Sequence, residues 1–263
     1  MDLGLAGKTA IVTGGSAGIG KEIARGLVAE GVDTVVTSRS RQRAESAAKD
    51  LKGPGRAVGL EVELRDAESV TAMVRAAERE LGGVSVLVNS GSDVSGNTPE
   101  DFTHITDEFI IESFETKFLG ILRAVREVVP GMRERGFGRI INIAGHKARE
   151  AGAIGAGARN AAVVHLTKTL AMKFGRDGIT VNAVLPFTTV TERLESRMSR
   201  MAERRGRSLD EHLASIASRT ALGRLVTAEE IADFVTFLAS PKSVSLTGEA
   251  VALTGGVSLA VHY

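Results

Sequence analysis

Apolar residues gather in seven short runs that are rich in β-branched side chains, at residues 9–13, 34–38, 57–64, 84–89, 139–144, 180–185 and 250–254. Most of these runs are almost uninterrupted, which is the pattern of parallel strands covered on both faces of a sheet. The run at 57–64 is the exception, because it carries Glu61 and Glu63. We therefore expect a largely buried parallel sheet.

The segments between these runs have helical periodicity, with apolar residues at positions such as 19, 23 and 27. The alternation predicts an α/β fold: a Rossmann-type doubly wound parallel sheet of about seven strands with helices on both faces. No linker or internal repeat divides the chain, so one domain over residues 1–263 is expected. The polar helical stretch at about 191–220, between the last two strands, is the one region that breaks this alternation.

Composition excludes several classes of protein. The 33 Lys and Arg residues and 32 Asp and Glu residues leave a net charge of +1, too little for a duplex nucleic-acid binder. The chain has no cysteine, and its five histidines show no ligand spacing, so no metal site is expected. Uncharged stretches are shorter than the ~18 residues of a membrane span, and the first residues carry no basic signal region. We expect a soluble cytoplasmic protein without a membrane partner.

A glycine-rich turn follows the first run and opens the first helical pattern, Thr-Gly-Gly-Ser-Ala-Gly-Ile-Gly at residues 13–20. Glycines at positions 14, 18 and 20 allow backbone N–H groups to close on a pyrophosphate at the positive end of a helix. A plain strand-to-helix turn would also contain glycine. The place of the turn in the first βα unit favours a dinucleotide site.

This turn resembles the phosphate loop of the short-chain dehydrogenase/reductase family, and the resemblance extends from residue 5 to about residue 258. It includes the strand at 86–91, the Gly-Arg-Ile-Ile-Asn-Ile strand at 138–143 and the Val-Asn-Ala-Val-Leu-Pro strand at 181–186, after which Phe187 replaces the family's glycine. The resemblance implies the Rossmann fold, a nicotinamide cofactor and hydride transfer between a carbonyl and an alcohol.

The end of the second strand indicates which cofactor binds. It reads Ser38-Arg39-Ser40-Arg41, with no carboxylate before Glu45, and arginine there suits a ribose 2′-phosphate. We therefore expect NADP(H), the alternative being that these arginines only begin a solvated helix. The resemblance places the cofactor against Gly14, Ser16, Gly18, Ile19, Gly20, Ser38, Arg39, Glu63, Leu64, Asn89, Pro186 and Thr191.

The catalytic positions depart from the family pattern, which has an Asn, a Ser and a Tyr-x-x-x-Lys pair. The tyrosine and lysine positions fall on Ala156 and Asn160, and the asparagine position falls on Lys117. Lysine and asparagine are thus exchanged. We expect Lys117 to place an ammonium beside Asn160 and to act as acid or base. The alternative is a solvated helix lysine.

The serine position falls on Ala144 or Gly145, and the chain's one tyrosine is Tyr263. His146 follows directly, at the carboxyl end of a strand where such sheets bind ligands, and is the second candidate for proton transfer. Its alternative is a polar residue on a solvated loop. The catalytic candidates are therefore Lys117, His146 and Asn160.

The stretch at about 191–220 covers the substrate in the resembled family, so the resemblance implies a helical lid there, the lid stretch. Four of its arginines share one helix face, Arg193, Arg197, Arg200 and Arg204. They suit an anionic or carrier-bound small-molecule substrate, or else form a solvated face or a subunit contact. With aromatics at 4%, the chain lacks the stacking platforms of an RNA binder. The helical patterns at 108–135 and 156–174 and the apolar end at 257–261 resemble the family's subunit contacts, so we expect a homo-oligomer, a tetramer.

The resulting hypothesis is an NADP(H)-dependent oxidoreductase of the short-chain type with a non-standard acid/base apparatus. One alternative is an enzyme that performs proton transfer, dehydration or cyclisation on the same scaffold. The other is a catalytically silent subunit that binds nucleotide. An intact phosphate loop disfavours loss of the nucleotide, whereas the missing tyrosine disfavours an ordinary reductase.

Overall fold

The computed structural model describes residues 2–91, 102–151 and 154–257. Seven parallel strands form one sheet in the order β3-β2-β1-β4-β5-β6-β9. They are β1 (Thr9–Thr13), β2 (Asp33–Ser38), β3 (Ala57–Glu61), β4 (Val86–Asn89), β5 (Gly138–Ile143), β6 (Ile179–Pro186) and β9 (Ala250–Leu253). The predicted fold class and all seven predicted strands are confirmed, although β3 ends at Glu61 rather than residue 64.

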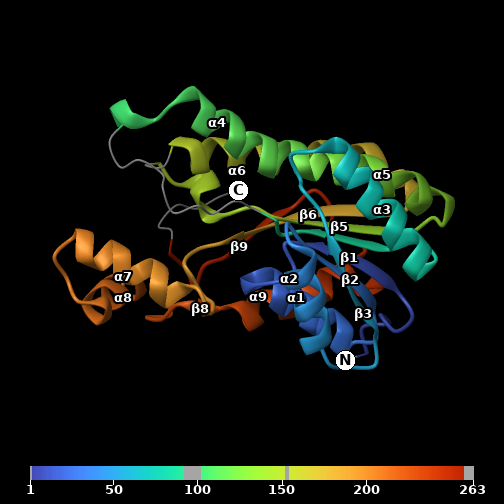
Figure 1. Cartoon of the computed structure of the whole chain (residues 1–263), viewed down its shortest axis with the longest axis horizontal. Helices are drawn as coiled ribbons and strands as arrows, with labels where there is room; N and C mark the ends of the chain where they lie inside the picture. The colour runs from blue at the N-terminus through green and yellow to red at the C-terminus, as the bar shows by residue number, and fades with distance from the viewer. Residues whose placement is uncertain (1, 92–101, 152–153, 258–263) are drawn as a thin grey trace.

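Helices cover both faces of this sheet (Figure 1). The helices α1 (Gly18–Ala29), α2 (Arg41–Asp50) and α9 (Ala228–Ala239) pack on one face, and α3 (Ala67–Leu81), α5 (Gly120–Glu134) and α6 (Ile154–Phe174) on the other. Neighbouring strand residues feed opposite cores: Ala10 and Val12 belong to the α1 side, and Ile11 to the α3 side. Both faces are therefore apolar, as the uninterrupted runs predicted.

The predicted helix over residues 108–135 is not continuous. It consists of α4 (Asp107–Phe114), a π-helical turn at Glu115–Leu119, and α5. A π turn adds a residue to the helical repeat and changes the direction of the side chains that follow. Lys117 lies in this turn, so its orientation could not be read from the 3.6-residue period.

The lid stretch forms two helices, α7 (Leu194–Arg204) and α8 (Leu209–Ala217), at one end of the molecule (Figure 1). The break between them occurs at Gly206, whose φ is +62°, and at Ser208, which begins α8 with a capping box. Two short parallel strands, β7 (Thr189–Val190) before this stretch and β8 (Val226–Thr227) after it, pair with each other. Further single turns of 3₁₀ helix lie at Phe102–His104, His146–Arg149, Gly175–Asp177 and Pro241–Ser243.

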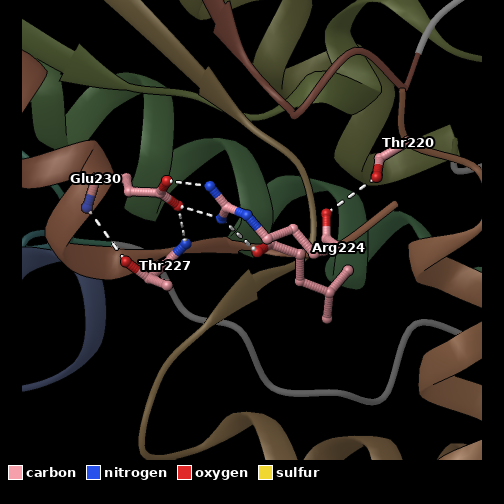
Figure 2. Close-up of polar contacts among 5 residues, drawn as sticks. Thr220, Arg224, Thr227 and Glu230 are labelled. Carbon is pink, nitrogen blue, oxygen red and sulfur yellow. Dashed lines mark hydrogen bonds and ion pairs between the residues drawn. The ribbon is translucent and has the colours of Figure 1, made fainter. Parts of the chain in front are cut away.

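A polar cluster fastens the end of the lid stretch to α9 (Figure 2). The Arg224 guanidinium donates to both carboxylate oxygens of Glu230, at 2.9 and 2.7 Å, and the same carboxylate accepts from the Thr227 N–H at 2.8 Å. The hydroxyl of Thr220 donates to the Arg224 carbonyl at 2.9 Å. The hydrogen bonds from Arg224 and then from Thr227 lower the pKa of Glu230 to about 2, so the cluster stays charged at neutral pH.

Candidate active site

A cavity of about 620 Å³ opens at the carboxyl ends of β1, β2, β4, β5 and β6. It crosses the point where the strand order reverses, between β1 and β4, which is where doubly wound sheets bind ligands. All the residues expected to contact the cofactor except Asn89 line it, namely Gly14, Ser16, Gly18, Ile19, Gly20, Ser38, Arg39, Glu63, Leu64, Pro186 and Thr191. The structure thus brings together residues that span most of the chain.

The glycine-rich turn is shaped as an anion cradle. Gly14 has φ +65°, and a Cβ on it would lie 2.8 Å from the Gly91 Cα. A Cβ on Gly20 would lie 2.5 Å from the Gly14 carbonyl oxygen, so the turn admits no larger residue at either position. Ala17 precedes α1 and has no side-chain acceptor for the first N–H groups of the helix. These donors suit an anion, and in this structure the Glu192 carboxylate accepts from one of them, the Gly18 N–H, at 2.8 Å.

The side of the cavity next to β2 is basic. Ser38, Arg39 and Arg43 line it, together with Arg65, which pairs with Glu63 at 3.5 Å. Arg43 and Arg65 were not predicted. Arg43 lies four residues after Arg39, in the first turn of α2, and that closeness in the chain was the available signal.

Arg41 is exposed and pairs with Glu45 at 2.9 Å. It is not among the described residues that line the cavity. For Arg41, the alternative of a solvated helix residue therefore holds.

Lys117 reaches the other side of the cavity, near the end of β5. It is only 4% exposed, and its Nζ donates to the Ile143 carbonyl oxygen at 2.5 Å. Burial, with a smaller contribution from the nearby Arg159 guanidinium, lowers the pKa of Lys117 to about 7. The lysine is therefore not the solvated residue of the alternative interpretation, and it can hold or release a proton near neutral pH.

Asn160 is buried at the same end, and its packing explains a local glycine. A Cβ on Gly145 would lie 2.7 Å from Asn160 Nδ2, so a serine at position 145 would collide with this amide. Arg159, the preceding residue on α6, also lines the cavity and donates to Ser113 Oγ at 2.6 Å. It was not predicted, although it is the one charged residue in the small-residue stretch 154–162.

Asn89 does not face the cavity. Its Nδ2 donates to Asn142 Oδ1 at 2.9 Å, and Asn142 Nδ2 donates to Thr167 Oγ1 at 2.9 Å. This buried chain of hydrogen bonds joins β4, β5 and α6. The expectation of a cofactor contact from the Asn89 side chain therefore has no support in this geometry, whereas its neighbours Ser90 and Gly91 do line the cavity.

His146 is also absent from the described residues that line the cavity. It is 5% exposed rather than placed on a solvated rim, and its ring packs edge-on against Phe187, with 5.9 Å between ring centroids. Burial is the main cause of a lowered pKa of His146. The structure brings Lys117 and Asn160 to one end of the cavity and leaves His146 behind its wall.

The lid contributes Arg193, Leu194, Ser196 and Arg200 to the cavity lining. The side chain of Arg197 lies outside what the structure describes, and Arg204 is not among the described lining residues. Within the described ranges, no group of three or more potential metal ligands occurs. Nor does that part of the chain contain a helix long and apolar enough to cross a membrane.

Residues 14–258 match the family profile described as enoyl-(acyl carrier protein) reductase. The chain belongs to the short-chain dehydrogenase/reductase family. The short-chain reductase protein NovJ of Streptomyces niveus is 37% identical over 250 residues, covering 94% of this chain and 92% of NovJ. The 3-oxoacyl-(acyl-carrier-protein) reductase FabG of Vibrio cholerae is 32% identical over 257 residues, covering 97% of this chain and 99% of FabG.

A solved structure of a reductase is similar over almost the whole chain. The L-sorbose reductase of Gluconobacter frateurii, complexed with NADPH and L-sorbose, is similar with a TM-score of 0.92 at 31% identity, covering 99% of this chain and 100% of that one. This short-chain protein is an oxidoreductase by family, and the NADPH in the L-sorbose reductase structure supports the NADP(H) cofactor that the sequence predicted.

Proposed function

We propose that this short-chain protein reduces a carbonyl group to an alcohol, or catalyses the reverse reaction, with Lys117 in place of the family's usual proton donor. The observation that carries the proposal is the buried Lys117 amine beside the cavity, with a pKa lowered to about 7. The family's serine position falls on Ala144 or Gly145, and its Tyr-x-x-x-Lys pair falls on Ala156 and Asn160. The chemistry of those residues would have to come from Lys117.

In this mechanism, bound NADPH supplies the hydride for the carbonyl carbon. The Lys117 ammonium gives one proton to the carbonyl oxygen, which completes the alcohol, and the resulting amine regains a proton from water. In the oxidation direction the neutral amine takes the hydroxyl proton. A group that titrates near neutrality serves both directions. The Asn160 amide, at the same end of the cavity, would hold the substrate oxygen by donating a hydrogen bond.

The cofactor would lie along the length of the cavity. The glycine-rich turn would bind its pyrophosphate, and Ser38, Arg39 and Arg43 its 2′-phosphate. Glu63 and Leu64 border the same side, Pro186 ends β6, and the Thr191 side chain lies beside Gly18 of the glycine-rich turn. The observation that supports this placement is the tight turn at Gly14 and Gly20, where a side chain would collide with the Gly91 Cα and the Gly14 carbonyl oxygen.

The substrate in this proposal is anionic or attached to an anionic carrier, and the 191–220 segment covers it within the single domain. Arg193 and Arg200 support this, because they bring two guanidinium groups to the cavity from the lid. Arg200→Gln should raise KM for such a substrate and weaken its salt dependence. Arg204→Gln is the control, because Arg204 is not among the described lining residues. Unchanged kinetics in Arg200→Gln would contradict the proposal.

We also propose that the protein assembles as a homo-oligomer, a tetramer. Three large apolar side chains are exposed on α4 and α6, namely Ile111, Ile154 and Met172. Exposed large apolar side chains on helices are typical of subunit contacts. Of the 257–261 segment, only Val257 lies within the described residues. Light scattering should give a tetramer at micromolar protein, and a monomer would contradict the proposal.

The experiment that tests the proposed function is a single-turnover measurement. The protein–NADPH complex is mixed with a panel of ketones, aldehydes and enones, and loss of the reduced-nicotinamide absorbance is followed. Rapid loss in the native protein that is slowed in Lys117→Met supports the proposal. Conversion of a substrate with no change in the nicotinamide would support a non-redox enzyme. NADPH binding with no conversion of any substrate would support a silent nucleotide-binding subunit.

A further inference from the structure

Phe187 forms part of the cavity wall at the end of β6. It follows Pro186, lines the cavity near the Lys117 end, and stands where the short-chain family has a glycine without a side chain. Its backbone is held as well, since the Thr189 hydroxyl donates to the Phe187 carbonyl at 3.2 Å. A phenyl ring at this position changes the space next to the reacting group.

Two side chains from distant parts of the sequence hold the ring. The His146 ring meets it at 87°, with 5.9 Å between centroids, and the Arg219 guanidinium carbon lies 5.3 Å from its centroid. His146 belongs to the turn after β5, whereas Arg219 follows α8 at the end of the lid stretch. Edge-to-face ring packing and a cation over a ring both restrict the ring's orientation.

The guanidinium of Arg219 is itself fixed. It donates to Glu150 at 2.7 Å, and the other oxygen of the same carboxylate accepts from Lys147 at 2.9 Å. Burial raises the pKa of Glu150, but the hydrogen bonds from Lys147 and Arg219 outweigh it and lower the pKa overall. Glu150 is therefore ionised at neutral pH. Through its carboxylate, Arg219 at the end of the lid stretch is bonded to the turn after β5, beside Phe187.

His146 is suited to packing rather than to proton transfer. Its Nδ1 is buried and makes no hydrogen bond to any described residue, and its side chain does not line the cavity. The charged groups that act on it are Glu150, which favours the imidazolium, and Lys147, Arg149 and Arg219, which oppose it. Together with burial, the three cations keep the ring neutral.

We propose that Phe187 is a specificity-determining residue, and that His146 and Arg219 are positioning residues that hold its ring against the substrate. At the cavity wall the ring is apolar and takes up space that a glycine would leave open, so the favoured substrate carries a planar, unsaturated or aromatic group beside its carbonyl, and bulky branched groups are excluded. The proposal rests on the proposed function, because it assumes that the substrate binds at the Lys117 end.

Two readouts separate this proposal from the proposed function. Calorimetry on the protein–NADP⁺ complex measures binding of acetophenone, 2-acetonaphthone and 1-adamantyl methyl ketone without any chemistry. NADPH oxidation with the same ketones measures turnover. The native protein should favour the two flat ketones in both readouts. Phe187→Gly should abolish that preference, lowering Kd and KM for the adamantyl ketone by about tenfold or more. Phe187→Leu, which keeps an apolar side chain, should weaken binding of the flat ketones.

The role of His146 is tested by His146→Phe, which keeps an aromatic ring but has no group that can donate or accept a proton. If His146 positions Phe187, this variant retains kcat and the flat-over-bulky ratio, whereas His146→Ala raises KM for the flat ketones and leaves kcat largely intact. His212→Ala is the matched control, because His212 is equally buried in α8 with an unpaired Nε2. Its flat-over-bulky ratio should match that of the native protein.

Loss of kcat in His146→Phe would overturn the positioning role and make His146 a proton donor. An unchanged flat-over-bulky ratio in Phe187→Gly, in both readouts, would overturn the specificity role. If the ratio changes in calorimetry while no variant oxidises NADPH, the role of Phe187 in selecting ligands stands and the proposed function fails.

Discussion

The carboxylate of Glu192 accepts a hydrogen bond from the backbone N–H of Gly18, with 2.8 Å between the two atoms. Gly18 is the first residue of α1, so its N–H is one of the donors that the proposed pyrophosphate site offers. Glu192 lies at the start of the lid stretch, and its carboxylate also pairs with the Arg193 guanidinium, with 3.8 Å between Arg193 Nε and Glu192 Oε1. In the proposed function, the Glu192 carboxylate would therefore compete with a bound pyrophosphate for one donor at the positive end of a helix.

Glu192→Gln should bind NADPH more tightly than the native protein. Removing the negative charge relieves repulsion of ~1 kcal/mol toward the pyrophosphate, which corresponds to a Kd lower by about three- to tenfold. Fluorescence titration of NADPH measures it. Glu195→Gln, on the exposed first turn of α7, is the control and should leave Kd unchanged. A Kd that rises in Glu192→Gln would mean that the carboxylate assists cofactor binding.

Arg39→Ala should lose preference for NADPH over NADH while retaining nucleotide binding. Loss of a charged hydrogen bond to the 2′-phosphate costs on the order of 1.5–3 kcal/mol, and NADH has no such group. Calorimetry with both nucleotides measures the ratio. Arg41→Ala is the matched control, because Arg41 pairs with Glu45 and is not among the described lining residues. Equal losses in both variants would point to a general basic surface instead.

Lys117→Met should reduce the rate of hydride transfer by ~10²–10⁴ without changing NADPH affinity, because it removes only the proton donor. Lys168→Met is the control, since Lys168 is exposed and lies 3.7 Å from Glu249. The native rate of ketone reduction should fall as pH rises through about 7, where Lys117 loses its proton, and the rate of alcohol oxidation should fall below that pH. A flat pH profile in stopped-flow measurements would argue against Lys117.

The same lysine makes a prediction about stability. Its pKa is about 7 when folded and 10.5 when unfolded, so the unfolded chain binds more protons throughout this interval. The free energy of unfolding of the native protein should therefore rise with pH in that window, by up to ~1.4 kcal/mol per unit from this group. Lys117→Met should be the more stable protein at pH 7, and its advantage should shrink toward pH 10. Denaturant curves with identical pH slopes for the two proteins would contradict the burial of a titrating lysine.

The order of residues within short segments of the sequence was sufficient to predict much of the fold. The strands could be located because apolar runs such as 139–144 and 180–185 must be covered on both faces. The glycine-rich turn could be assigned because its glycines fall within eight consecutive residues, 13–20, and the structure shows the close approaches that require Gly14 and Gly20. The basic side of the cavity could be predicted for the same reason, since Ser38 ends β2 and Arg39 directly follows it.

The Lys117 end of the cavity could not be predicted in the same way, because it depends on contacts between residues that are far apart in the sequence. Lys117 titrates near neutral pH because it is buried, and it lies in a π turn from which its Nζ reaches the Ile143 carbonyl, 26 residues away. Asn160 fits because position 145 is a glycine. His146 and Asn89, which sequence position places beside a ligand, instead pack against Phe187 and Asn142.

The chain's own sequence thus determined the strands, the phosphate turn and the cofactor preference, since each rests on residues that are neighbours along the chain. Only the tertiary structure decided which polar side chains reach the cavity and which are buried behind it. The physical reason is that desolvation, close approach and charge repulsion depend on distance in space, and the residues that impose them here lie tens of positions apart.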